Sequence, residues 1–205
     1  MDVNEYGPLV WKTLHCSAKL NGHCDRFNRF IVYLQKYFPC SLCRLHICEN
    51  LKLLPLNTSV PCFEWSVKFH NIVNQQLNKP TYEYAKASND VDTWVRSNPN
   101  VRVTLFFSTL FALLKYCENE NDMTCTCFLQ LSLDLYTMLG LSKTYAHFDT
   151  NDIKVAFLGC KRPPVLLLTL MNLLRKYDKN VNEHAILSRY YTQSGWDRLK
   201  MLKAA

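Results

Sequence analysis

The chain has 205 residues, of which 48% are hydrophobic, enough for one sizeable core or two small ones. Its net charge of +7 is spread in short basic pairs, so the sequence does not support nucleic-acid binding. No segment is long and apolar enough to span a bilayer, and no positively charged start precedes an apolar stretch. We therefore expect neither a membrane span nor a secretory signal.

Apolar positions recur at three- and four-residue spacing in nearly every segment, and only five residues are glycine, so we predict an all-α protein. In the first half, the first predicted helix follows Gly7-Pro8 and ends near Asn21, and the second includes residues 27–34. The third runs from Cys40 to about Leu54 and the fourth from Phe63 to Leu77. A fifth occupies residues 82–94.

The polar turn at residues 97–100 contains a proline and separates two apolar-periodic regions. We place a domain boundary there, which gives a first domain of residues 1–97 and an additional helical domain of residues 98–205. The second domain is predicted to hold helices at residues 101–116, 128–139, 164–176 and 183–202, with connectors at residues 119–122 and 144–161.

Two cysteines three positions apart, Cys40 and Cys43, lie just after Pro39 and open an apolar-periodic segment. Proline ends the preceding helix but tolerates the start of a new one, so both thiols are expected in a first helical turn. Backbone N–H groups there stabilise a thiolate, which is the attacking species in disulfide exchange. The pair is therefore a candidate redox dithiol.

The same segment also has the composition of a zinc site, with Cys40, Cys43, His46 and Cys48 as ligands. If the segment is helical, Cys40 and His46 lie roughly 9 Å apart along the axis, too far to share one ion readily. A loop would remove that objection. The spacing alone leaves open a redox pair, a zinc site and two incidental buried thiols.

Three segments in the first half together resemble the FAD-dependent sulfhydryl oxidases of the Erv/ALR family. They are YGPLVWKTLH at residues 6–15, YFPCSLCRLH at residues 37–46 and WSVKFHNIVNQQLNKP at residues 65–80. The family patterns are W-G-P-x-x-W-x-x-L-H, Y-P-C-x-x-C-x-x-H and H-N-x-V-N-x-x-L-x-K-P, and they occur here in family order. The resemblance covers roughly residues 5–96.

The resemblance implies a four-helix bundle with FAD at one end and a short fifth helix. It matches Cys43 to the flavin-proximal cysteine and Cys40 to the cysteine that exchanges with substrate, with no metal. The positions matched to cofactor binding are Gly7, Trp11, His15, Cys43, His46, His70, Asn71, Val73, Asn74, Lys79 and Tyr82. Independently of the family, His70 and Asn74 are four residues apart and share a helix face, where they can hydrogen-bond a nucleotide.

The implied reaction oxidises protein dithiols, with O2 as the electron acceptor and H2O2 as product. A thioredoxin-like carrier or viral structural proteins are the expected substrates, and a homodimer is expected. Compact members of this kind are similar to oxidases of large DNA viruses, which suggests the host cytoplasm and the virion. The alternative is a non-catalytic, zinc-stabilised helical interaction protein.

The chain departs from the family at several positions. Val67 and Tyr84 stand where cellular members carry a second cysteine pair, so we expect the cofactor site to rely on packing instead of that disulfide. Cys125 and Cys127 are either a shuttle pair or two unrelated thiols. The second half has no recognisable site, and its apolar helix at residues 105–114 could cover the family's dimer surface or extend a dimer interface.

Overall fold

The computed structural model describes residues 3–21, 24–38, 40–56, 59–98, 100–117, 125–144, 149–157 and 163–177. All regular secondary structure in these ranges is helical, which confirms the predicted all-α class. The helices are α1 (Val3–Asn21), α2 (Cys24–Tyr37), α3 (Ser41–Leu53), α4 (Cys62–Gln76), α5 (Tyr84–Ser97), α6 (Val101–Cys117), α7 (Cys125–Met138), α8 (Leu141–Thr144), α9 (Thr150–Phe157) and α10 (Pro163–Tyr177).

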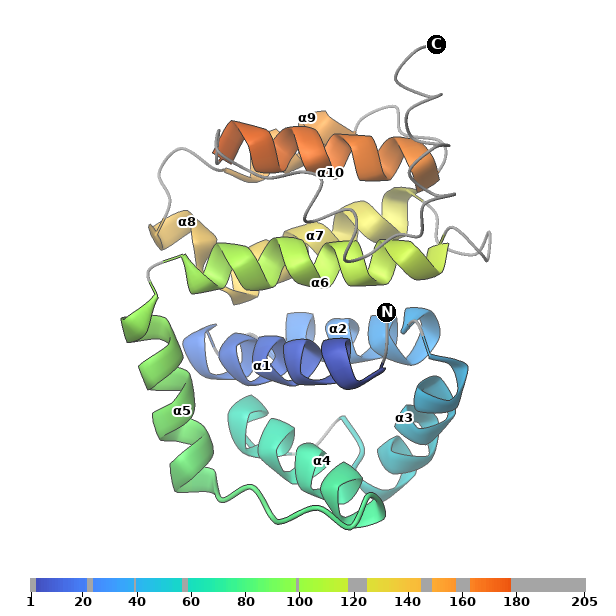
Figure 1. Cartoon of the computed structure of the whole chain (residues 1–205), viewed down its shortest axis with the longest axis vertical. Coiled ribbons are helices and arrows are strands. Elements are labelled where there is room, and N and C mark those ends of the chain that lie inside the picture. The colour runs from blue at the N-terminus through green and yellow to red at the C-terminus, as the bar shows by residue number, and fades with distance from the viewer. Residues whose placement is uncertain are drawn as a thin grey trace.

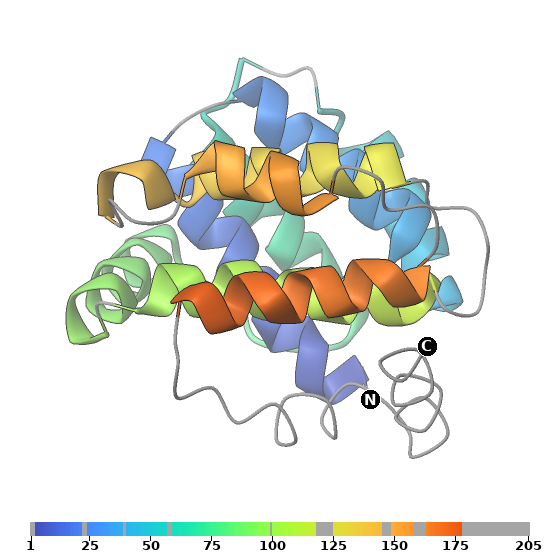
Figure 2. The same cartoon turned by 90° about the horizontal axis from the view of Figure 1, so that it is seen from above.

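The helices form stacked layers, with α1 and α2 in the middle (Figures 1 and 2). Helices α3, α4 and α5 lie on one side of this pair, where α1 contacts α4 and α5, and α2 contacts α3. Helices α6 and α7 lie on the other side, against α1 and α2, and are covered in turn by α9 and α10. Helices α1 and α2 therefore lie between the other helices of the first half and the helices of the second half.

Helix α2 shows how apolar spacing produces this arrangement. Phe27, Phe30, Ile31 and Leu34 recur at intervals of three and four residues, and all four are buried. Its remaining face is mostly polar, with exposed or partly exposed charged residues. Fully burying side chains of this size stabilises the fold by about 1.5–3 kcal/mol each.

Polar contacts between helices fix how the first-half helices meet. Asn50 of α3 and Gln76 of α4 exchange two amide hydrogen bonds, of 3.1 and 2.7 Å. Lys19 of α1 forms an ion pair with Asp92 of α5 at 2.7 Å and donates to the carbonyl of Ser88. Because Asn50 is fully buried and Lys19 is only partly exposed, the contacts favour one relative placement of the helices.

The second-half helices continue the same core. Phe106, Leu110 and Phe111 of α6 are almost fully buried and belong to one hydrophobic cluster that also contains the apolar face of α2. The Oγ1 atoms of Thr13 in α1 and Thr109 in α6 lie 2.9 Å apart within this contact. The described part of the chain therefore has a continuous core across residue 98.

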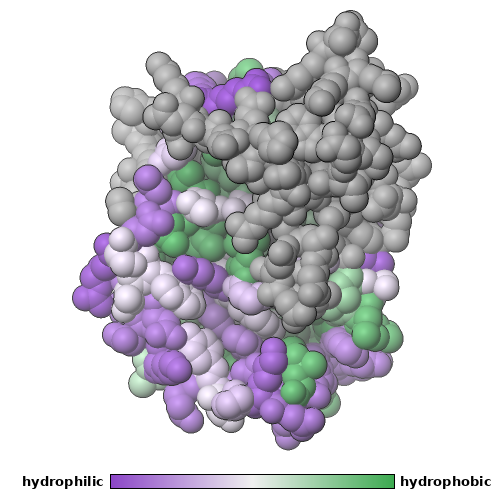
Figure 3. All heavy atoms as spheres, in the orientation of Figure 1, coloured by the Kyte–Doolittle hydropathy of each residue, from purple (hydrophilic) through white to green (hydrophobic). Residues whose placement is uncertain are grey.

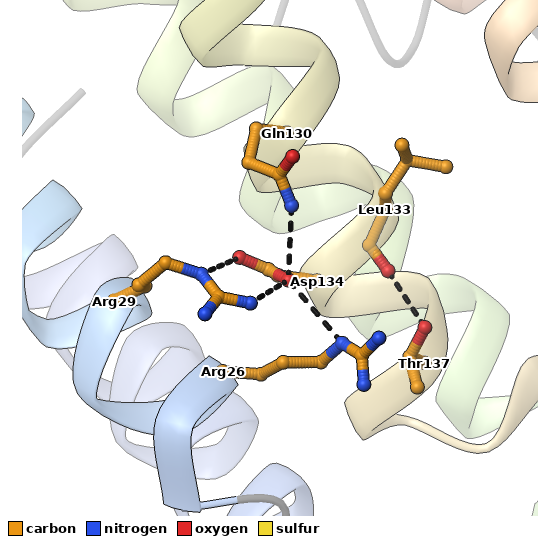
Figure 4. Close-up of polar contacts among 6 residues, drawn as sticks. All are labelled: Arg26, Arg29, Gln130, Leu133, Asp134 and Thr137. Carbon is orange, nitrogen blue, oxygen red and sulfur yellow. Dashed lines mark hydrogen bonds and ion pairs between the residues drawn. The ribbon is translucent and has the colours of Figure 1, made fainter.

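One buried carboxylate joins α7 to α2 (Figure 4). Asp134 of α7 receives two hydrogen bonds from Arg29, at 2.9 and 2.8 Å, and lies 3.4 Å from the Nε atom of Arg26. Gln130, one turn earlier in α7, also donates to it at 3.3 Å. The hydrogen bond to Asp134 raises the pKa of Arg29 above its ordinary value.

The predicted helices agree with the structure in the first half, with one difference. Helix α1 begins at Val3 instead of after Gly7-Pro8 and contains Pro8. Pro8 is the sixth residue of this helix, beyond the first four N–H groups that lack intrahelical partners, so it removes one backbone hydrogen bond from the early turns of α1. In the second half, α6, α7 and α10 match predicted helices, whereas the helix predicted at residues 183–202 lies outside the described residues.

The connector predicted at residues 144–161 was wrong, because it contains α9. The side chain of Asp149 accepts from the backbone N–H of Asp152 at 2.9 Å, and Asp152 accepts in return from the N–H of Asp149 at 3.3 Å. This reciprocal cap starts the helix. Ile153 and Phe157, four residues apart, then bury the same face against the core.

A disulfide that the sequence did not predict joins Cys24, at the start of α2, to Cys62, at the start of α4. Its Cα atoms lie 5.9 Å apart, and the bond closes a separation of 38 residues. Bridging chain segments this far apart typically stabilises a fold by about 2–4 kcal/mol. The first half is therefore held by this covalent link as well as by packing.

Candidate active site

Cys40 and Cys43 form a disulfide at the N-terminus of α3, with Cα atoms 5.2 Å apart. Cys40 is the N-cap residue in an extended conformation, with φ −111° and ψ 114°, and Cys43 lies in the first turn. The backbone N–H of Cys43 donates to Cys40 Sγ at 3.1 Å. After reduction, the same N–H and the positive end of the helix would stabilise a thiolate on Cys40.

The turn that presents this disulfide is held on both sides. Arg44 of α3 donates from Nη1 to the carbonyl of Phe38 at 2.7 Å, which closes the α2–α3 turn. The buried ring of Phe38 packs edge-on against Tyr6 of α1, with centroids 5.7 Å apart. The start of α1, where the first family-like segment begins, therefore lies against the turn that carries the cysteines.

The predicted zinc ligands do not converge. Cys48 Sγ instead accepts a hydrogen bond from Gln35 Nε2 at 3.0 Å, and His46 is exposed on α3. Among the residues that the structure describes, no three histidine, cysteine, aspartate or glutamate side chains form a group that could hold a metal ion. The segment is helical, which is the condition under which its spacing argued against zinc.

A second cluster, of aromatic and histidine rings, lies between α1 and α4. Trp11 and His70 are stacked with centroids 4.0 Å apart and an interplanar angle of 5°. The ring of His15 lies 5.2 Å from that of His70, also stacked, and Tyr82 approaches both histidines. These residues were predicted to surround the cofactor, and the structure brings all four together.

Hydrogen bonds connect the two histidines to the body of α4. His15 Nε2 lies 2.9 Å from His70 Nδ1, and His15 Nδ1 lies 3.0 Å from Ser66 Oγ. Burial, with a smaller contribution from His70, lowers the pKa of His15 from 6.5 to about 3. Burial and then the charge of Lys79 lower the pKa of His70 to about 4. Both rings are therefore neutral at neutral pH.

Two asparagines that were predicted to bind the cofactor hold the segment after α4. Asn71 donates from Nδ2 to the carbonyl of Tyr82 at 3.0 Å and accepts from the Tyr82 N–H at 2.7 Å. The side-chain Nδ2 of Asn74 donates to the carbonyl of Pro80 at 3.2 Å, and the backbone carbonyl of Asn74 accepts from the backbone N–H of Lys79 at 2.8 Å. The turn bends at Asn78, whose φ of 53° asparagine tolerates better than most residues.

Tyr82 connects this segment to α5. Its hydroxyl donates to Asp90 Oδ2 at 2.8 Å. Burial, followed by the hydrogen bond to Asp90, raises the pKa of the phenol well above its ordinary value, so the hydroxyl stays protonated. Helix α5, which has 14 residues, therefore fixes the ring that borders both histidines.

The remaining predicted site residues are more open. His46 and Lys79 are exposed, and Val73 is half-buried on α4. A Cβ atom added at Gly7 would meet no atom of the described residues within 4 Å, so these residues leave open space beside this glycine. Cys125 and Cys127 lie in the first turn of α7, where Cys127 is half-buried, and the side chain of Cys125 is outside the described part.

The surface around the disulfide combines polar and apolar residues. In Figure 3, the lower part of the visible face is mostly hydrophilic and is interrupted by small hydrophobic areas. Leu42, between the two cysteines, is 59% exposed, and Leu45, one turn later, is 54% exposed. Two large apolar side chains thus reach solvent beside the disulfide.

Residues 9–94 match the Erv1/Alr family. A FAD-linked sulfhydryl oxidase of African swine fever virus is 32% identical over 92 residues, which are 41% of this chain and 77% of the viral protein. The chain belongs to the Erv1/Alr family. A yeast relative, a FAD-linked sulfhydryl oxidase of Saccharomyces cerevisiae, is 28% identical over 109 residues, covering 49% of this chain and 56% of the yeast protein.

The family match ends at residue 94, just before the C-terminus of α5. No solved structure matches the chain. Within the part of the chain described here, every helix is too short or too polar to cross a bilayer.

Sequence reasoning missed one residue of this cluster of rings, Ser66, which bonds to His15. It lies four residues before His70, so helical spacing places both on the same face of α4. A serine in a helix interior was the available signal, because such a hydroxyl usually bonds either to a preceding carbonyl or to a tertiary partner. Ser66 does both.

Proposed function

We propose that this protein is an FAD-dependent thiol oxidase that forms disulfide bonds in protein dithiols. The observation that carries the proposal is the Cys40–Cys43 disulfide at the N-terminus of α3, in a chain that belongs to the Erv1/Alr family. The helix N-terminus stabilises a thiolate on Cys40, so the pair can exchange with an incoming thiol. Relatives of the family are named FAD-linked sulfhydryl oxidases, which supports the same activity here.

The residues present fit FAD. Trp11 and His70 provide flat, neutral and partly exposed rings against which an aromatic ring system can pack, and buried His15 supports them from behind. The open space at Gly7 allows a ligand to approach the backbone of α1, and the exposed ammonium group of Lys79 can neutralise a diphosphate. When bound, FAD accepts the electron pair of the reduced cysteines and transfers it to O2, which forms H2O2.

The chain's own step is thiol–disulfide exchange. A substrate thiolate attacks Cys40 Sγ, the Cys40–Cys43 bond breaks, and Cys43 leaves as a thiolate. The second substrate thiolate then attacks the substrate sulfur in the mixed disulfide and expels Cys40. One substrate disulfide has formed and one protein disulfide has been reduced, so the electron pair now resides on Cys40 and Cys43.

The exposed leucines beside the cysteines support an extended or partly unfolded protein segment as substrate, since Leu42 and Leu45 offer apolar contact without a closed pocket. A thioredoxin-like carrier and viral structural proteins are the two substrate classes that we propose. The similarity to African swine fever virus oxidase supports a viral role in the host cytoplasm and in the virion.

Residues 98–205 are proposed to form an accessory domain after an oxidase domain of residues 1–97. Helices α6 and α7 cover α1 and α2 within one chain, so a homodimer would have to form through another face. Cys125 and Cys127 are proposed as a shuttle that passes electrons from protein substrates to Cys40. If so, replacing both should slow oxidation of protein substrates much more than that of small dithiols.

Oxygen consumption with dithiothreitol tests the proposal. The wild-type chain should purify yellow with stoichiometric FAD and consume oxygen, whereas Cys40→Ser and Cys43→Ser should keep FAD and lose at least about 1000-fold in turnover. Cys48→Ser is the matched control, because Cys48 is a half-buried cysteine of the same helix outside the disulfide. Undiminished turnover in Cys43→Ser, or a colourless protein, would refute the assignment.

A further inference from the structure

Ser66, His15 and His70 form a continuous series of hydrogen bonds, buried at Ser66 and His15, that the exchange reaction does not use. Ser66 Oγ lies 2.7 Å from the carbonyl oxygen of Phe63 and 3.0 Å from His15 Nδ1. His15 Nε2 lies 2.9 Å from His70 Nδ1. His15 is 1% exposed and Ser66 is fully buried, so water does not compete for these contacts.

The carbonyl of Phe63 determines which atom is the donor in each of these hydrogen bonds. A carbonyl only accepts, so the single hydroxyl hydrogen of Ser66 is donated to it. Ser66 Oγ can then only accept from His15, which places the hydrogen of His15 on Nδ1. A neutral imidazole carries one N–H, so His15 Nε2 has no hydrogen and accepts from His70 Nδ1.

The outcome is a defined acceptor on His70. Because its one hydrogen is on Nδ1, its Nε2 carries only a lone pair. His70 is partly exposed, whereas Nδ1 faces buried His15, so Nε2 is the ring nitrogen left for a ligand. The stacked contact with Trp11 at 4.0 Å holds the ring in this orientation.

We propose that Ser66 is a positioning residue that fixes the tautomer of His15 and, through it, that of His70, so that His70 Nε2 accepts a hydrogen bond from an N–H or O–H group of FAD. This inference rests on the proposed function only for the identity of the ligand. The proton arrangement itself follows from the contacts within the chain.

The surroundings favour neutral rings. A proton added to His15 Nε2 would face the N–H of His70, so two donors would meet at 2.9 Å. Lys79 is the charged group that acts on His70, and Tyr82 approaches both rings while its hydroxyl is bonded to Asp90. The lowered pKa values of the two histidines agree with this arrangement.

The test combines histidine nitrogen NMR on the full-length protein, with FAD and after its removal, with FAD-binding titrations. In the wild type, His15 and His70 should each show hydrogen on Nδ1 and none on Nε2. Ser66→Ala should produce a mixture of tautomers at both residues and weaken FAD binding about five- to tenfold, the effect of one lost hydrogen bond. Ser66→Thr keeps the hydroxyl and should restore both readouts.

Ser132→Ala is the matched control. Ser132 is a buried helical serine that donates to the carbonyl of Phe128 at 2.8 Å, so its loss removes the same local bond without a histidine partner. It should leave both tautomers and FAD affinity unchanged. Hydrogen on His70 Nε2 in the wild type, or a Ser66→Ala variant with unchanged tautomers, would overturn the proposal. Wild-type protein that has these tautomers but binds no FAD would refute the proposed function and the ligand assignment, and would leave the proton arrangement standing.

Discussion

The two halves of the chain bury different kinds of side chain. In the described first half, the buried polar residues are Thr13, His15, Ser17, Asn50, Ser66 and Asn74. In the described second half they are Thr109, Ser132 and Asp134. Thr109 and Asp134 bond to the first half, and Ser132 bonds to its own helix.

The buried polar side chains of the two halves therefore have different roles. Buried polar groups cost free energy unless they are hydrogen-bonded, so they persist where they have a task. In the first half, His15, Ser66 and Asn74 position rings and a turn around a candidate cofactor site. In the second half, Thr109 and Asp134 attach their helices to α1 and α2. The described part of the second half therefore packs its helices α6 and α7 against the helices that carry the site.

Arg29→Met should have the largest effect, because it removes the two-bond partner of a buried carboxylate. Asp134 would keep only Arg26 and Gln130, and we expect a loss of about 2–3 kcal/mol in the free energy of unfolding. Urea denaturation followed by tryptophan fluorescence measures it. Since the core is continuous, wild type and variant should both unfold in one transition.

Arg96→Met serves as the control, because Arg96 is exposed and donates only to a carbonyl in its own helix. It should change stability by less than about 0.5 kcal/mol. If Arg29→Met were equally mild, the carboxylate would not join the two halves. Two separate transitions would show that the halves fold independently.

Acid should destabilise the whole fold through buried His15 and partly exposed His70. The pKa of His15 is lowered from 6.5 to about 3 in the folded state, so below about pH 6.5 the unfolded chain takes up a proton that the folded chain refuses. The contribution of neutral His15 to the free energy of unfolding is complete above this pH and falls as the pH decreases toward 3. From about pH 7 to about pH 5, the free energy of unfolding should fall by about 2 kcal/mol because of His15 alone. The more exposed His70 should lower it by less.

Urea titrations at both pH values check this dependence. His15→Gln should remove its part of the acid loss, whereas His46→Gln, at an exposed histidine of α3, should retain the wild-type slope. A pH dependence that is the same in His15→Gln and wild type would mean that His15 is not the group responsible.

Gly7→Ala should have the smallest effect on folding and a selective effect on the cofactor. Alanine is the better helix former by up to about 1 kcal/mol, and its Cβ would meet no atom of the residues that the structure describes. The FAD-free protein should therefore be equally or slightly more stable, while FAD affinity falls about tenfold if the cofactor approaches α1 here. Thermal unfolding and FAD titration separate the two, with the exposed Thr104→Ala as a helix-propensity control.

Local patterns were sufficient for much of this structure. Pro39 and the apolar spacing of α2 predicted where that helix stops and which face it buries. The motifs that contain Trp11, His15 and His70 predicted residues that the fold brings together across 55 or more positions.

Other features depend on contacts that no local pattern contains. Cys24 and Cys62 pair because two helix starts meet in space, and Asp134 is buried because two arginines of another helix face it. Ser66 acquires its role from His15 on α1. The start of α9 was readable from its paired aspartates, but the helix has only 8 residues, and an apolar pattern this short is easily taken for a connector.

Anaerobic titration with dithiothreitol tests most directly whether Cys40 and Cys43 deliver electrons to a flavin. In the wild type, one dithiol per FAD should bleach the visible flavin absorbance. In Cys43→Ser the flavin should stay oxidised under the same conditions. Flavin reduction in Cys43→Ser at the wild-type rate would contradict the account, because electrons would then reach FAD without the cysteine pair.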